Sequence, residues 1–163
     1  MKKRMEDIIK YSHRDLCLKA AKYLKNEGIV PFYKCQYVVC ELERCGECPD
    51  AFGIGDNTQL IEVKVSRSDF LSDKNKYWRK NPEFGLGQYR SYLCPEGLIN
   101  VEDLPNNWGL LWVNDKGKIT KICNPIKQEH NNIAEMKVLT SILRREGIKP
   151  QIFNYKKYKN EIN

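Results

Sequence analysis

Residues 49–64 restrict the fold of this chain more than any other stretch. They read P-D-A-F-G-I-G-D-N-T-Q-L-I-E-V-K, in which two short apolar runs flank a turn at residues 55–57. Gly, Asp and Asn favour tight turns, so the runs at 51–55 and 59–65 are expected to pair as a β-hairpin. The sequence therefore predicts a hairpin within a β-sheet, with its polar side chains meeting at the rim of that sheet.

The hairpin carries polar side chains at positions that can meet. Side chains alternate between the two faces of a strand, so Glu62 and Lys64 project from one side while their apolar neighbours face the core. Pairing of the two strands brings Asp50 beside them. Because carboxylates are hard oxygen ligands, Asp50 and Glu62 are suited to Mg²⁺ or Mn²⁺. A lysine at such a metal can orient an attacking water or help to deprotonate it.

The pattern Pro49-Asp50 followed by Glu62-Val63-Lys64 resembles the motif of the PD-(D/E)XK nuclease superfamily. Three further runs are similar to its MmcB-like DNA-repair and phage branch, and the similarity covers roughly residues 10–145. They are E-V-K-V-S-R-S-D-F-L-S-D (62–73), Y-R-S-Y-L-C-P-E-G-L-I (89–99) and W-G-L-L-W-V (108–113). The resemblance implies an α/β fold with a restriction-endonuclease-like core, in which helices flank a central mixed β-sheet.

The same resemblance implies a Mg²⁺- or Mn²⁺-dependent deoxyribonuclease, acting in DNA repair or phage DNA processing. Asp50 and Glu62 would hold one or two metal ions, with the backbone carbonyl of Val63 as a further ligand. Lys64 would position the water or stabilise charge in the transition state. Glu41 matches an acidic position in resembling sequences and is another candidate ligand, although a solvent-facing strand carboxylate explains it equally well.

A basic run follows the hairpin and suggests a nucleic-acid surface. Its cations alternate with Tyr77 and Trp78, and they are Lys74, Lys76, Arg79 and Lys80. Lys and Arg side chains contact phosphates, and aromatic rings stack on unpaired bases. A solvated helix face explains such a run equally well. Gln88 and Tyr92 match the Q-x-x-x-Y signature of RecB-like nucleases, so Gln88 is a further nucleic-acid candidate. That signature belongs on a helix, whereas residues 89–94 read as a strand.

Length and composition limit the number of domains and the kinds of partner that we expect. The 163 residues suit a single domain over 1–150, followed by a basic C-terminal tail over 151–163. Lys and Arg outnumber Asp and Glu by 28 to 21, a net charge of +7 that favours a polyanionic partner, with DNA first, or simply aids solubility. No run is apolar enough to span a bilayer and no signal-peptide core follows the N-terminus, so a cytoplasmic protein without a membrane partner is expected.

The seven cysteines favour reduced thiols over disulfides, since their number is odd and no export signal is visible. Cys45 and Cys48 have the spacing of half a zinc site, but a second such pair is missing. A structural Zn²⁺ ion or iron–sulfur cluster is therefore the less favoured alternative. Two other functions stay open: a non-catalytic nucleic-acid-binding module on a nuclease fold, and a zinc-binding interaction protein.

Local patterns also predict the secondary structure. Ser12 and Asp15 form a capping-box pattern at the start of a helix that Gly28 ends, which favours capping over metal binding for Asp15. A second helix begins near Ser66. The other expected elements are strands over 29–32, 36–43, 89–94, 108–113 and 118–122, and a closing helix over 132–145.

Overall fold

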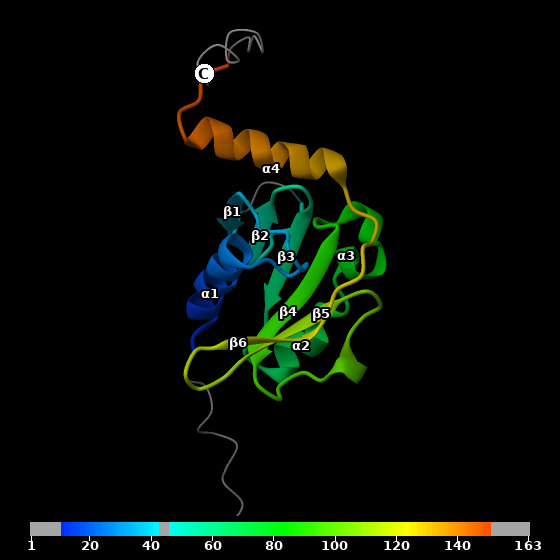
Figure 1. Ribbon diagram of the computed structural model, residues 1–163. Helices are drawn as coiled ribbons and strands as arrows, with labels where there is room; N and C mark the ends of the chain where they lie inside the picture. The colour runs from blue at the N-terminus through cyan, green and yellow to red at the C-terminus, as the bar shows by residue number, and fades with distance from the viewer. Residues whose placement is uncertain (1–10, 43–45, 151–163) are drawn as a thin grey trace, which may run out of the picture.

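The computed structural model describes residues 11–42 and 46–150, and it has a single sheet with helices on both faces (Figure 1). The helices are α1 (His13–Asn26), α2 (Arg67–Asp73), α3 (Tyr77–Lys80) and α4 (Asn132–Arg145), with short 3-10 turns at Pro82–Phe84 and Val101–Asp103. The strands are β1 (Tyr37–Cys40), β2 (Ala51–Ile54), β3 (Thr58–Val63), β4 (Tyr89–Pro95), β5 (Gly109–Val113) and β6 (Ile119–Cys123).

The six strands lie in the sheet in their order along the chain. β1, β2 and β3 are antiparallel neighbours, β3, β4 and β5 run parallel, and β6 is antiparallel to β5. This confirms the predicted α/β class with a central mixed sheet flanked by helices. The predicted hairpin is present as β2 and β3, and Ala51 pairs with Ile61.

Two apolar cores lie on opposite faces of the sheet. One packs α1 against the sheet through Leu16, Ala20, Ile61 and Val63, and the other includes Phe70 of α2 and the N-terminal half of α4. Ile61 and Val63 thus face a core, as the alternation predicted. The face that carries Glu62 is also covered, because the connection between the parallel strands β3 and β4 must cross the sheet and here contains α2 and α3.

Helix α1 begins as its sequence predicts. The Ser12 side chain accepts a hydrogen bond from the backbone N–H of Asp15, whose carboxylate in turn accepts one from the backbone N–H of Ser12. Asp15 is therefore a capping residue and not a metal ligand. Gly28 follows the helix with φ of 78°, and a Cβ at this position would collide with the Tyr33 carbonyl.

Other elements agree with the sequence to different degrees. The bounds of α4 are those predicted, and its Asn131 cap accepts from the backbone N–H of Ala134. The strand expected over 29–32 is wrong: this segment makes a single bridge between Val30 and Tyr33.

Within the described ranges, none of the helices has the length and apolar character needed to cross a bilayer. The predicted basic tail lies outside the described residues.

Candidate metal and nucleic-acid site

The hairpin brings Asp50, Glu62 and Lys64 together as the sequence predicted. Pairing of Ala51 with Ile61 places Asp50 opposite Glu62 at the next position of the antiparallel ladder. One carboxylate oxygen of Asp50, Oδ2, accepts a hydrogen bond of 2.8 Å from the backbone N–H of Val63. Lys64 Nζ lies 3.5 Å from Glu62 Oε2. Glu62 and Lys64 are therefore in contact where β3 ends, and Asp50 lies opposite Glu62 at the start of the neighbouring strand.

The second oxygen of Asp50 faces a residue that sequence reasoning missed. His13 Nε2, in the first turn of α1, lies 3.3 Å from Asp50 Oδ1. The His13 side chain is 41% exposed and that of Asp50 is 15% exposed, so this part of the site is open to solvent. His13 directly follows the capping residue Ser12, but the residue that it faces across the fold depends on how α1 packs on the sheet.

Glu62 is a buried carboxylate in which one oxygen has charged partners and the other has no hydrogen-bond partner among the described residues. Its side chain is 2% exposed, and Oε2 lies 3.5 Å from Lys64 and Lys76 and 3.3 Å from Arg79. Oε1 has no hydrogen-bond partner among the described residues. Burial raises the pKa of Glu62 to about 7; the charge of Arg79 opposes this rise and that of Asp50 adds to it. Glu62 is thus poised to take a proton or a cation.

Asp73 is the centre of an ion-pair network that the sequence did not predict. Its carboxylate lies 3.2 Å from Lys64, 2.8 Å from Lys76 and 2.7 Å from Arg79, and it accepts a hydrogen bond of 2.6 Å from the Tyr92 hydroxyl. Burial opposes ionisation of Asp73, yet the charge and hydrogen bonds of Arg79, Lys76 and Tyr92 hold its pKa well below the usual range. Asp73 therefore stays ionised and fixes these cations.

The network sets three cations, Lys64, Lys76 and Arg79, against three buried carboxylates. Glu47 adds a third carboxylate, 2.6 Å from Arg79. The Lys64 side chain is 3% exposed, and Asp69 lies 3.8 Å from it. The side chains of Lys76 and Asp69 are 45% and 42% exposed, respectively. The buried Glu62 and Lys64 are therefore in contact with charged side chains of α2 and of the segment that follows it.

The basic run does not form one nucleic-acid surface. Lys76 is half exposed beside Glu62, Lys74 is exposed with its ammonium 5.1 Å from the Phe70 ring centre, and Lys80 is exposed. Arg79 corrects the prediction, because its side chain is only 2% exposed and it is held between Glu47, Asp73 and the Trp108 ring. A buried guanidinium with these partners does not contact a phosphate.

The prediction for Gln88 is also corrected. β3 and β4 are parallel, so Gln88, which precedes β4, lies at the end of the sheet away from Glu62 and Lys64. Its side-chain oxygen accepts from the backbone N–H of Thr58. Tyr92 does reach the network through its hydroxyl, but from a strand and not from a helix.

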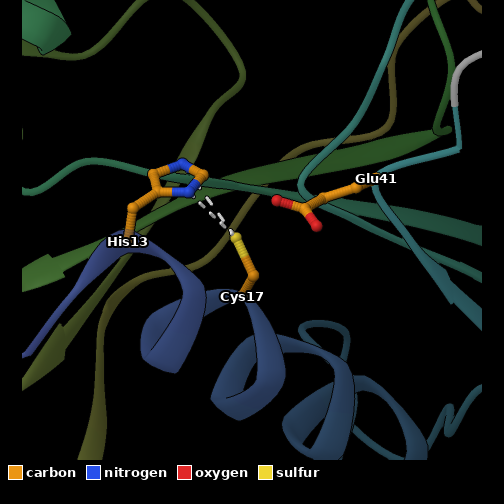
Figure 2. Close-up of side chains that lie close together, drawn as sticks. All are labelled: His13, Cys17 and Glu41. Carbon is orange, nitrogen blue, oxygen red and sulfur yellow. Dashed lines mark hydrogen bonds between the residues drawn. The ribbon is translucent and has the colours of Figure 1, made fainter.

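The remaining candidates from the sequence are Cys45, Cys48 and Glu41. Cys45 is outside the described residues, and Cys48 is exposed. Glu41 follows β1, and its backbone N–H donates to the Pro49 carbonyl. Its side chain groups with His13 and Cys17 of α1, as Figure 2 shows, and not with Glu62.

Comparisons with known proteins do not identify a function for this chain. No family model matches the chain, and no curated protein matches it. Among solved structures, the chain is similar to the SPO1766 protein of unknown function from Silicibacter pomeroyi, with 21% sequence identity and a TM-score of 0.46. The similarity covers 72% of this chain and 84% of that chain.

Proposed function

We propose that this protein is a metal-dependent nuclease that hydrolyses DNA phosphodiester bonds. The observation that carries the proposal is the buried Glu62 Oε1, which lacks a hydrogen-bond partner in the part of the chain that the structure describes, while Asp50 directly precedes the neighbouring strand β2. A buried carboxylate oxygen without a partner is costly unless something binds it. A divalent cation between the two carboxylates supplies that partner.

The donor set fits Mg²⁺ or Mn²⁺. Asp50 and Glu62 offer hard carboxylate oxygens, and the negative charge of Asp50 adds to the burial that raises the pKa of Glu62. A dication offsets this repulsion. The Val63 carbonyl is a third hard oxygen at the same strand end.

The residues around the carboxylates have separate roles in the proposed reaction. A bound metal would lower the pKa of water and offset the charge that builds on the phosphate. Lys64 is held by Glu62 and Asp73, so its ammonium has a fixed position from which to orient the attacking water or the phosphate oxygens. Lys76, the half-exposed cation of the network, contacts the incoming phosphate. Water attacks phosphorus, and the bond to the leaving oxygen breaks.

A second candidate is a non-catalytic nucleic-acid-binding module on the same fold. The balanced network favours it, because Lys64, Lys76 and Arg79 already neutralise Glu47, Glu62 and Asp73 without a metal. Such a network is a structural device in many proteins. The two candidates differ in what Asp50 does, since Asp50 makes no ion pair with these three cations among the described residues.

A cleavage assay separates the two candidates. Single-stranded, duplex, flapped and nicked DNA are incubated with Mg²⁺ or Mn²⁺ and the wild type, Asp50→Asn or the control Asp56→Asn, which changes an exposed carboxylate in the turn of the same hairpin. We expect cleavage by the wild type and the control and loss in Asp50→Asn, with circular dichroism unchanged. Equal cleavage by all three, or salt-sensitive binding without cleavage, contradicts the nuclease.

A further inference from the structure

A second group of metal-ligating side chains lies next to Asp50, and the proposed nuclease reaction does not use it as a unit. His13 and Cys17 are one turn apart on α1, and Glu41 approaches them from the segment after β1 (Figure 2). One ligand atom from each of the three residues lies within 4.8 Å of the others. These atoms are a nitrogen, a sulfur and a carboxylate oxygen.

We propose that His13, Cys17 and Glu41 bind a zinc ion at a site distinct from the one between Asp50 and Glu62. Zinc takes this mixture of sulfur, nitrogen and oxygen donors, and three protein ligands leave its fourth position open to water. Mg²⁺ selects oxygen ligands and is poorly served by a thiolate. The two neighbouring sites thus differ in the metals that they select.

The helix already spaces two of the ligands for a tetrahedral ion. Cys17 Sγ lies 3.4 Å from His13 Nδ1. Bonds of about 2.3 Å to sulfur and about 2.0–2.1 Å to nitrogen, at a tetrahedral angle, separate the two donors by about 3.6 Å. Without metal, the thiol and the imidazole hydrogen-bond to each other at nearly this separation. Glu41 is exposed, so a change of its side-chain rotamer completes the set.

Asp50 fixes the imidazole from the other side. His13 Nε2 lies 3.3 Å from Asp50 Oδ1, and a proton on Nε2 leaves the Nδ1 lone pair facing Cys17. A carboxylate behind a ligating histidine sets the tautomer and the ring orientation in many zinc sites. Asp50 is therefore a positioning residue for the proposed zinc ion, in addition to its proposed role as a ligand of the catalytic metal.

The local field and the exposure suit a cation that enters from solvent. Cys17 is 2% exposed, whereas the carboxylates of Asp50 and Glu41 lie on the solvent side of its thiol. These negative charges attract a dication, and binding to sulfur releases the thiol proton. His13 and Glu41 form the open side of the site, and Cys17 forms its floor.

Cobalt substitution tests the site in the full chain under reducing conditions. We expect the wild type to show a thiolate-to-Co²⁺ charge-transfer band and the visible bands of tetrahedral Co²⁺, and one equivalent of Zn²⁺ to abolish both. Cys17→Ser and the surface variants His13→Gln and Glu41→Gln should remove or strongly weaken these bands. Asp50→Asn should keep them and weaken Zn²⁺ affinity about 10- to 100-fold, the usual effect of losing an outer carboxylate.

The control is the double variant Cys45→Ser/Cys48→Ser, which should retain the cobalt spectrum and the zinc stoichiometry. Loss of zinc in this variant together with retention in Cys17→Ser overturns the proposal and assigns the ion to the Cys45–Cys48 pair. Absence of a tetrahedral cobalt spectrum from the folded wild type overturns it as well. These measurements use neither nucleic acid nor Mg²⁺, so their outcome is independent of the proposed nuclease activity.

Discussion

His13 Nε2 and Asp50 Oδ1 lie 3.3 Å apart, so the first turn of α1 touches the carboxylate that precedes β2. The same carboxylate accepts the Val63 N–H through Oδ2. Asp50 is therefore held from both sides in one orientation, opposite Glu62 in the hairpin. This contact joins the proposed catalytic metal site to the proposed zinc site.

Metal affinity should depend on pH through Glu62. The pKa of Glu62 is raised to about 7, so a cation must displace a proton below that value. Mn²⁺ affinity measured by calorimetry should rise about tenfold per pH unit up to about pH 7 and then level off. The variant Glu62→Gln should bind Mn²⁺ weakly at every pH. We expect a wild-type change on the order of tenfold per pH unit between about pH 5.5 and about pH 7. A wild-type affinity that stays constant over this range contradicts the role of Glu62.

The same raised pKa predicts how stability varies with pH without metal. The pKa of Glu62 is about 7 in the folded state and 4.5 in its ordinary state, so the folded protein binds the extra proton between these values. The contribution of Glu62 to the free energy of unfolding should therefore fall as pH rises from about 4.5 to about 7. Urea unfolding should show this fall in the wild type and a flatter profile in Glu62→Gln. An identical profile in both proteins assigns the slope to other groups.

Removing the charge of Asp73 should destabilise the fold. Asp73→Asn leaves Lys64, Lys76 and Arg79 without their shared buried partner, and losing one side of a buried pair costs about 3–5 kcal/mol. Because the pKa of Asp73 is lowered, this contribution is present above about pH 4 and is lost as pH falls further.

The matched control for Asp73 is Asp69→Asn. Its carboxylate contacts the same Lys64 but is 42% exposed, so the cost should stay below about 1 kcal/mol. Urea unfolding at pH 7 measures both values. Equal losses in the two variants argue that the buried network adds nothing beyond a surface ion pair.

Lys76 should contribute to DNA binding more than a remote lysine does. It is the exposed cation nearest the site, 3.5 Å from Glu62, whereas Lys137 is an exposed lysine on α4. Lys76→Ala should weaken binding and reduce the slope of log affinity against log salt by about one, as loss of one phosphate contact does. Lys137→Ala should change neither. Fluorescence anisotropy over a salt series gives both slopes.

The sequence predicted features that local chemistry determines. The capping box of Ser12 and Asp15 set the start of α1, and strand alternation with a turn brought Asp50 to Glu62 and Lys64. The sequence did not predict features that depend on packing between distant segments. The contact of His13 with Asp50 needs α1 docked on the sheet, and Glu47 reaches Arg79 from 32 positions away.

The two wrong nucleic-acid candidates have the same kind of cause. A run of cations does not reveal which of them a later segment will cover, so the sequence predicts a surface position for Arg79, whereas the structure packs it against Trp108. The end of the sheet at which Gln88 lies depends on β3 and β4 being parallel, which a motif match does not encode.

Anomalous diffraction from crystals grown with Mn²⁺ shows whether Asp50 and Glu62 bind one ion. Two carboxylates on neighbouring chain segments should share it, so we expect an anomalous peak within coordination distance, about 2.2 Å, of oxygens from both Asp50 and Glu62. The peak should be absent from crystals of Asp50→Asn. A Mn²⁺-soaked crystal in which Glu62 still pairs only with Lys64, Lys76 and Arg79, and no peak lies between the two carboxylates, contradicts it.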